Sequence, residues 1–346
     1  MNKLTKVGCS ALCSSLAAIS AANAGELGVT GGATLTYTSL GTEVTGNPYG
    51  MASAVTFKGS GELDNGWTYG LTIAHGDKDA YSASNIDIVM GGFGSINFNQ
   101  GNSGNGIAAY DNVMPTAWEE AHGAGLSGGV HAVLGVGSSD NVQWTLPTTL
   151  GTTIAVAYAF DVGTSDTADK TAKSANNNTG RGLDATIKMN PSLGTEILSG
   201  LNLYAGASTI DVYDNANANE DKWEGVGAIT YALGPVEIGF MTSAIYDGDE
   251  TNVDYHTYKN TAFGVAFNVN DDFSVSYGNY QTRKAGFVGT RAQGGPKDRV
   301  VEVSSWQAAY TMGGASFKVA DVKADNAGFS SGNNTDATIV SLGLAF

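Results

Sequence analysis

The side chains with the clearest chemical potential are three carboxylates within one long polar segment. Asp111, Glu119 and Glu120 lie in residues 101–140, the longest stretch of the chain without regular patterning. A structureless connection of about 40 residues in a compact protein is usually functional. Carboxylates gathered around a narrow passage favour cations. The alternative is that these acids are solvated surface residues, so the interpretation depends on the elements that position the segment.

A second group of acids gathers in two later polar segments, residues 211–222 and 247–254. Asp247, Asp249 and Glu250 stand closest together in the sequence. Clustered carboxylate oxygens are the ligands that Ca²⁺ prefers, although no spacing here matches an EF-hand. One interpretation is a weak calcium site at these three residues, and the other is a solvated acidic surface.

No local pattern indicates an enzyme. The four histidines, His75, His122, His131 and His256, are too scattered to form an obvious metal pair. The glycine-rich residues 101–106 lack the glycine spacing and the lysine of a nucleotide-binding loop. A Ser-His-Asp site is defined in space and stays open on sequence grounds. We therefore expect no catalytic residues, no metal centre and no cofactor, with calcium as the exception to test.

The N-terminal residues have the character of an export signal. Lys3 and Lys6 are followed by a short apolar stretch and then by Ala22-Asn23-Ala24, an A-x-A cleavage pattern. This arrangement predicts a secretory signal peptide over residues 1–24, too short in its apolar part to span a bilayer. Both cysteines lie inside it, so the mature chain, residues 25–346, is expected to be free of cysteine and of a lipid anchor.

The composition favours extended sheet and argues against nucleic acid. The formal net charge is −16, which leaves no basic surface to meet phosphates. The chain has 48 glycines but only 6 prolines, and few prolines suit uninterrupted strands. The mean hydropathy is −0.08, with no run of 18 apolar residues. Strands with one apolar and one polar face average to such a value.

Alternation of apolar and polar residues runs through the whole chain and predicts strands. Residues 67–73, 154–160, 236–240 and 263–269 each carry apolar side chains at every second position. Tight turns alternate with long polar connections, which is the pattern of outer-membrane barrels. Residues 190–200 are the exception, because this connection is long for its side. The expected strands number sixteen: 28–38, 50–62, 67–75, 84–91, 94–100, 141–147, 152–161, 181–190, 200–210, 223–233, 235–246, 258–269, 273–283, 300–312, 315–324 and 335–346.

The last of these segments carries the sharpest pattern. Thr338, Val340, Leu342, Leu344 and Phe346 share one face of the strand. Membrane barrels close by pairing the last strand with the first, which leaves no exposed edge. The fold class predicted is therefore all-β, a transmembrane antiparallel up-and-down β-barrel of 16 strands.

Three segments resemble a known family. Residues 57–66 (FKGSGELDNG) look like the second strand and first turn of general Gram-negative porins. Residues 91–96 (GGFGSI) followed by Gly101 and Asn102 resemble the strand that leads into the third loop of those porins. The C-terminal Phe346 completes the likeness, which covers the start, the early barrel and the end of the chain. The acidic, glycine-rich alphaproteobacterial type is the most similar.

The resemblance implies a function as well as a fold. Porins of this kind are homotrimers in the bacterial outer membrane, in contact with lipid, and pass small hydrophilic solutes and ions by diffusion. Their third loop folds into the lumen, so residues 101–140 would line the pore constriction with Asp111, Glu119 and Glu120. A wall arginine of the family falls at Ala54, so on strand 50–62 only Lys58 remains as a base. Lys188 and Lys318 are further inward candidates.

An excess of acids over bases at the constriction predicts a modest cation preference. Two alternatives to a passive porin remain at this point. One is a substrate-selective channel, which would need aromatic ladders or basic clusters along the lumen. The other is a structural or adhesive barrel that acts through its acidic loops.

Overall fold

The computed structural model describes residues 27–41, 46–77, 83–101, 104–137, 139–164, 170–172, 179–191, 198–212, 221–247, 255–287 and 299–345. The expected signal peptide, residues 1–24, and the terminal Phe346 lie outside these residues. Within the described part of the chain, no helix has the length and apolar character needed to cross a membrane.

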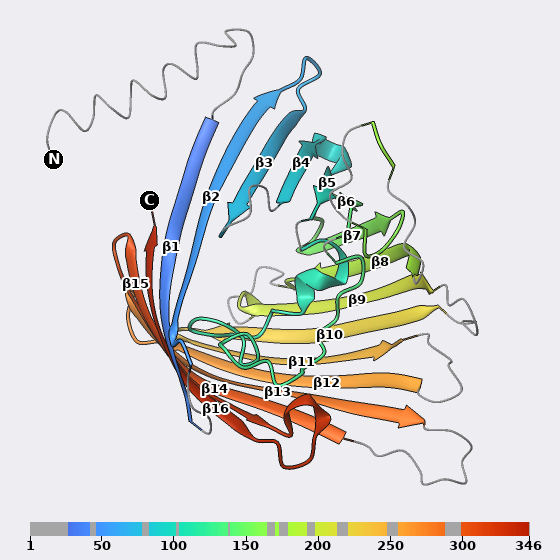
Figure 1. The fold of residues 1–346 in the computed structure, drawn as a ribbon. Helices are drawn as coiled ribbons and strands as arrows, with labels where there is room; N and C mark the ends of the chain where they lie inside the picture. Colours follow the sequence, from blue (N-terminus) through green and yellow to red (C-terminus); the bar gives the residue numbers. More distant parts are fainter. Residues whose placement is uncertain are drawn as a thin grey trace, which may run out of the picture.

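Sixteen antiparallel strands form one closed barrel, with each strand paired to its neighbours in the sequence (Figure 1). The predicted fold class is therefore confirmed. The strands are β1 Leu27–Leu40, β2 Tyr49–Glu62, β3 Thr68–Gly76, β4 Ala83–Val89, β5 Ser95–Gln100, β6 Asn141–Thr145, β7 Thr152–Ala159, β8 Thr179–Met189, β9 Leu201–Val212, β10 Lys222–Leu233, β11 Val236–Tyr246, β12 Tyr255–Asn268, β13 Phe273–Phe287, β14 Arg299–Met312, β15 Ala315–Asp325 and β16 Thr335–Ala345.

The barrel closes through the first and last strands. β1 pairs with β16 in a register that runs from Gly32 opposite Ala345 to Leu40 opposite Ala337. Every strand therefore has a hydrogen-bonding partner on both sides, which removes the exposed edges that a lipid environment cannot satisfy. The largest departures from the predicted strands are the start of β12, which begins at Tyr255, and the end of β13, which continues to Phe287. β6 stops at Thr145, before Pro147, which has no backbone N–H to donate.

The two faces of the wall differ as the alternation predicts. Large apolar side chains such as Phe57, Phe240 and Trp306 are exposed on the outer face. The inner face carries small and polar residues, many of them buried. Phe57 is 39% exposed, so its neighbour Lys58 lies on the inner face, in agreement with the predicted parity.

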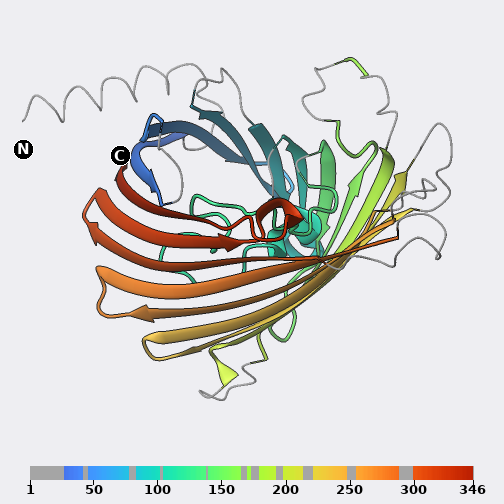
Figure 2. The ribbon, with the colours of Figure 1, turned by 60° about the horizontal axis from the view of Figure 1, so that its bottom comes forward.

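Residues 101–140 are called the inner loop from here on, and their described residues 104–137 and 139–140 lie inside the barrel (Figure 2). The loop contains the 3₁₀ helix η2, Gly106–Tyr110. Ile107, Met114 and Val133 of the loop form one buried apolar cluster with Val301 and Val322 of the wall. The hydrophobic core of this molecule is therefore the contact between the inner loop and the inner face of β10–β16.

A row of glycines in the wall makes room for this contact. Gly239, Gly264 and Gly278 are direct neighbours across β11, β12 and β13. A Cβ atom at Gly239 would come within 2.5 Å of the Pro115 Cδ, and one at Gly264 within 2.8 Å of the Pro115 carbonyl oxygen. Met114 and Pro115 therefore sit in a groove that exists only because these wall positions carry no side chain.

We predict that Gly264→Ala loosens the inner loop while leaving the barrel intact. The added methyl group must displace the Pro115 backbone, and such overpacking costs about 1–3 kcal/mol. The expected result is faster limited proteolysis within residues 101–140, with an unchanged β-sheet signal in circular dichroism. Gly227→Ala is the matched control, because a Cβ there would lie 3.9 Å from the nearest neighbouring atom, the Tyr204 carbonyl oxygen. Equal cleavage of both variants would contradict the prediction.

Candidate functional site

The inner loop follows the wall in one direction and then returns. Its outgoing limb passes from β8, where Ile107 is bound, to β14, where Trp118 and Glu119 are bound. At Gly125 the loop lies against Ile339 of β16. The return limb leads back to β8, where Val136 is bound. Irregular backbone inside a barrel cannot use the sheet ladder, so its N–H and C=O groups need other partners.

Two wall carboxylates hold the base of the loop. Asp184 of β8 accepts hydrogen bonds from the backbone N–H groups of Ile107 (2.9 Å) and Val136 (3.1 Å). Glu224 of β10 accepts from the N–H groups of Leu134 (2.7 Å) and Gly135 (3.1 Å). Lys222 lies 2.6 Å from the second oxygen of Glu224 and balances its charge. Both limbs of the loop are thus attached to the same part of the wall.

Glycines allow the backbone to approach Asp184 this closely. Gly106 and Gly135 have φ values of +63° and +53°, a region that other residues rarely adopt. A Cβ atom at these positions would lie 2.0 Å and 2.1 Å from the Asp184 carboxylate oxygen. The carboxylate and the two glycines therefore form a single structural unit.

Amide and hydroxyl side chains of β13 and β14 hold the outgoing limb. The side-chain oxygen of Gln307 accepts from the N–H groups of Trp118 (3.1 Å) and Glu119 (2.9 Å), while its Nε2 donates to the Glu119 carbonyl (2.6 Å). Ser276 accepts from the N–H of Ala117 (2.8 Å). These hydrogen bonds fix the backbone next to Glu120.

The return limb and the start of the loop are held in the same way. Asn260 donates to the His131 carbonyl, and Thr282 accepts from the His131 N–H (3.1 Å). At the start, Asn105 donates to Asn141 (2.7 Å), and the Gly106 N–H donates to the side chain of Gln143 (2.8 Å). Every attachment point of the loop backbone described here uses a polar side chain on the inner face.

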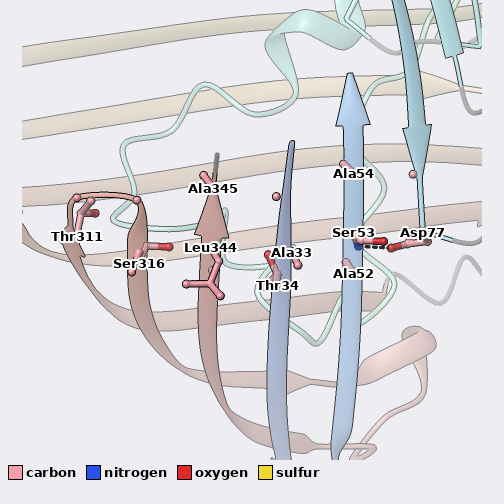
Figure 3. Close-up of a pocket in the computed structure, with 16 residues that line it drawn as sticks. Ala33, Thr34, Ala52, Ser53, Ala54, Asp77, Thr311, Ser316, Leu344 and Ala345 are labelled. Atoms are coloured by element: carbon pink, nitrogen blue, oxygen red, sulfur yellow. Dashed lines mark hydrogen bonds between the residues drawn. The ribbon is translucent and has the colours of Figure 1, made fainter. Parts of the chain in front are cut away.

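The wall of β1–β6 has a different character. Its inward positions are mostly threonine, asparagine, alanine and glycine, and Lys58 is the one base among them. A cavity of about 590 Å³ lies along β1, β2, β15 and β16 (Figure 3). Its lining combines the inward residues Thr34, Ala54 and Ser316 with the exposed Leu344 of β16. Figure 3 also shows the Ser53 backbone N–H donating to Asp77 at 2.9 Å.

The structure brings two of the predicted site residues together. Asp111 follows η2, and Glu120 comes after the stretch held by Gln307. Both side chains are half-buried, whereas Glu119 is exposed. Lys58 is an exposed residue of β2, and among the described residues no hydrogen bond or ion pair joins it to these acids. Lys188 and Lys318 instead lie over aromatic rings, at 5.4 Å from the Tyr204 centroid and 5.7 Å from the Trp118 centroid.

Burial changes the acidity of the loop carboxyls. Desolvation, and after it the charge of Glu120, raises the pKa of Asp111 from 3.8 to about 6. Desolvation likewise raises the pKa of Glu120, with a smaller contribution from the charge of Glu119. Both groups are therefore weaker acids than free carboxyls, and Asp111 changes its charge around pH 6.

The anchoring residues Asp184 and Glu224 were not identified by sequence reasoning. A signal was present, because both acids fall at inward positions within predicted strands, where a charge needs a partner. The partner could not be read from the sequence, since it is loop backbone 48 to 90 residues away.

Only one of the three residues of the expected calcium site belongs to the described part of the chain. Asp247 follows β11, whereas Asp249 and Glu250 lie outside the described residues. In the described part of the chain, no group of three or more His, Cys, Asp or Glu side chains is placed to hold a metal ion.

Comparisons with known proteins identify the fold through structure alone. No protein-family model matches the sequence, and no curated protein sequence matches it. OmpF of Salmonella typhi, solved in complex with daunomycin, is similar with a TM-score of 0.66 and 11% identity, over 93% of this chain and 98% of that one. The anion-selective porin of Comamonas acidovorans gives 0.64 and 11%, over 93% and 99%. OmpT, an outer membrane protein of Vibrio cholerae, gives 0.63 and 11%, over 92% and 97%.

We predict that Asp184→Ala releases the base of the inner loop. Two buried N–H groups would lose their acceptor, and an unsatisfied buried donor costs about 1–3 kcal/mol. Limited proteolysis within residues 101–140 should accelerate about tenfold or more. Glu237→Ala is the charge-matched control, since Glu237 is an inward-facing acid of β11 that joins none of the loop hydrogen bonds in the described residues. Cleavage at the wild-type rate in Asp184→Ala would show that the anchor is dispensable.

Proposed function

We propose that this chain is an outer-membrane porin, which forms a water-filled channel for passive diffusion of small hydrophilic solutes and ions. The observation that carries the proposal is the arrangement of the barrel interior. The inner loop is fastened along the face of β8–β16, with its start held by β6, and the wall of β1–β4 carries mostly short polar side chains. Such an interior narrows a pore without filling it. The structural similarity to porins supports this function.

The cation preference is a separate part of the proposal. The loop presents Asp111, Glu119 and Glu120, whereas the wall of β1–β6 has Lys58 as its single inward base among the described residues. An excess of carboxylates at a constriction attracts cations. The similar porin of Comamonas acidovorans is anion-selective, so the barrel fold does not set the sign of the selectivity. The charged side chains of each chain must do so.

The assembly and location follow from the same proposal. We expect export through the signal peptide of residues 1–24, insertion into the bacterial outer membrane in contact with lipid, and association as a homotrimer. One of the similar structures is a trimer form of OmpT, and this supports the expectation of a homotrimer. The chain is proposed to have no enzymatic activity and no resident cofactor, with weak calcium binding at Asp247, Asp249 and Glu250 as a further expectation.

The direct test is single-channel recording in planar bilayers with the purified protein. A water-filled porin should insert as open channels with ohmic current, and a trimer should give conductance steps in groups of three. Under a tenfold KCl gradient, the reversal potential should have the sign of potassium preference. Absence of conductance would overturn the porin assignment, and chloride preference would overturn the cation preference alone.

The cation preference should weaken in mild acid. Protonation removes the negative charge of Asp111, whose raised pKa of about 6 places the change between about pH 7 and 5. The potassium-to-chloride permeability ratio should therefore fall as the pH decreases through this window. Asp111→Asn should show a lower ratio at pH 7 and a flatter pH dependence. A ratio in the wild type that stays constant from pH 7.5 to 5 would contradict this prediction.

A further inference from the structure

One buried hydroxyl group beside the loop acids has no partner. Tyr280 of β13 is 2% exposed, and its hydroxyl makes no hydrogen bond in the described structure. A buried hydroxyl left unsatisfied costs about 1–3 kcal/mol, and such groups are rare in native proteins. The position of Tyr280 therefore calls for a ligand.

The surroundings of this hydroxyl indicate the chemistry of that ligand. Glu120 and Asp111 both lie close enough for their charges to act on the phenol, yet neither accepts a hydrogen bond from it. Glu120 and Asp111 also act on one another. Two carboxylates and a phenol oxygen thus converge without direct contact between the phenol and the acids. Two carboxylates beside an unpartnered hydroxyl favour a positively charged group as the missing partner.

His122 bounds the same place on the loop side. Its ring centroid lies 4.5 Å from that of Tyr280, and its Nδ1 is a second buried atom without a partner. Burial lowers the pKa of His122, so the imidazole is neutral at pH 7 and adds no competing positive charge. Two neighbouring rings, one from the wall and one from the loop, therefore each carry a buried polar atom without a partner.

We propose that Asp111, Glu120 and the Tyr280 hydroxyl form a binding site for a singly charged cation, with a primary ammonium group of a permeating solute as the ligand that fits best. The inference deepens the proposed cation preference and rests on the proposed porin function. It locates that preference at one site on the inner loop and names amines as a favoured solute class.

The number and type of groups select this ligand. A primary ammonium has three N–H donors, and the site offers three acceptor groups, two of them negatively charged. Calcium takes six to eight oxygen ligands, more than these residues supply, and no metal-binding group is found among the described residues. An alkali ion such as potassium shares the single positive charge but lacks directional donors. Binding of an ammonium group and binding of an alkali ion can therefore be distinguished by experiment.

The test uses thermal unfolding of the purified barrel in detergent, which requires no transport. Ethylammonium chloride, potassium chloride and tetraethylammonium chloride are compared at equal ionic strength. A ligand that binds only the folded protein raises its unfolding temperature with concentration. Ethylammonium should stabilise the wild type most, and tetraethylammonium, which has no N–H donor, least. Equal effects of potassium and ethylammonium would support a site for alkali ions, with the single charge as the common feature.

Two variants and a control assign the effect to these residues. Tyr280→Phe removes only the hydroxyl, and the apparent dissociation constant for ethylammonium should rise about threefold to tenfold. Asp111→Asn, which is isosteric, should weaken ethylammonium binding at least as much. It provides the same test if the Tyr280→Phe variant does not fold. Glu119→Gln removes an equal charge from the same loop, but from an exposed residue, and should change the constant less than twofold.

A different set of results is expected if no cation binds at Tyr280. If Tyr280 has no cationic ligand, Tyr280→Phe removes an unsatisfied hydroxyl and makes the barrel more stable, while all three salts act on it as on the wild type. That outcome, or equal stabilisation of the wild type by all three cations, overturns the site. A channel that conducts normally in bilayers while these binding results fail would leave the porin function in place.

Discussion

The constraint on which the interior depends is that irregular backbone enclosed in a barrel cannot satisfy all of its hydrogen bonds within its own segment. The strands satisfy their N–H and C=O groups through neighbouring strands, but the inner loop has no such ladder. Asp184, Glu224, Asn260 and Gln307 supply the missing partners from the wall. Without them the loop would have to leave the wall to reach water, because unpaired buried groups are costly.

The wall meets two different environments, and its sequence reflects both. Its outer positions carry large apolar side chains, as contact with lipid hydrocarbon requires. Its inner positions under the loop combine hydrogen-bonding residues with the glycine row of Gly239, Gly264 and Gly278, which lets the loop lie against the strands. The inner positions of β1–β4 make none of the hydrogen bonds found to hold the loop in the described residues, and they carry mostly short polar residues instead. The period-2 alternation thus encodes both the membrane contact and the path of the loop.

The fold could be predicted from the sequence because its causes are local. Alternation within 9 to 11 residues defines a strand, and turn lengths define which strands pair, so the expected elements agree with the sixteen observed. The site could be predicted only as a list of acids. Asp111 and Glu120 lie together because the outgoing limb curves along the wall. That path depends on Gln307, which is almost 190 residues away from Glu119 in the sequence. Asp184 and Glu224 were missed for the same reason.

The acids of the interior divide into two kinds by what they bind. Asp184 and Glu224 accept hydrogen bonds from loop N–H groups, and Glu224 also pairs with Lys222, so both carboxylates are engaged in holding the loop. Asp111 and Glu120 stand on the loop itself, half-buried and close to one another, and their mutual repulsion is relieved only by protonation or by a cation. The total number of acids in the interior therefore overstates the preference of the channel for cations. The anchoring carboxylates fix the geometry, and the loop carboxylates that they position are the ones available to a passing ion.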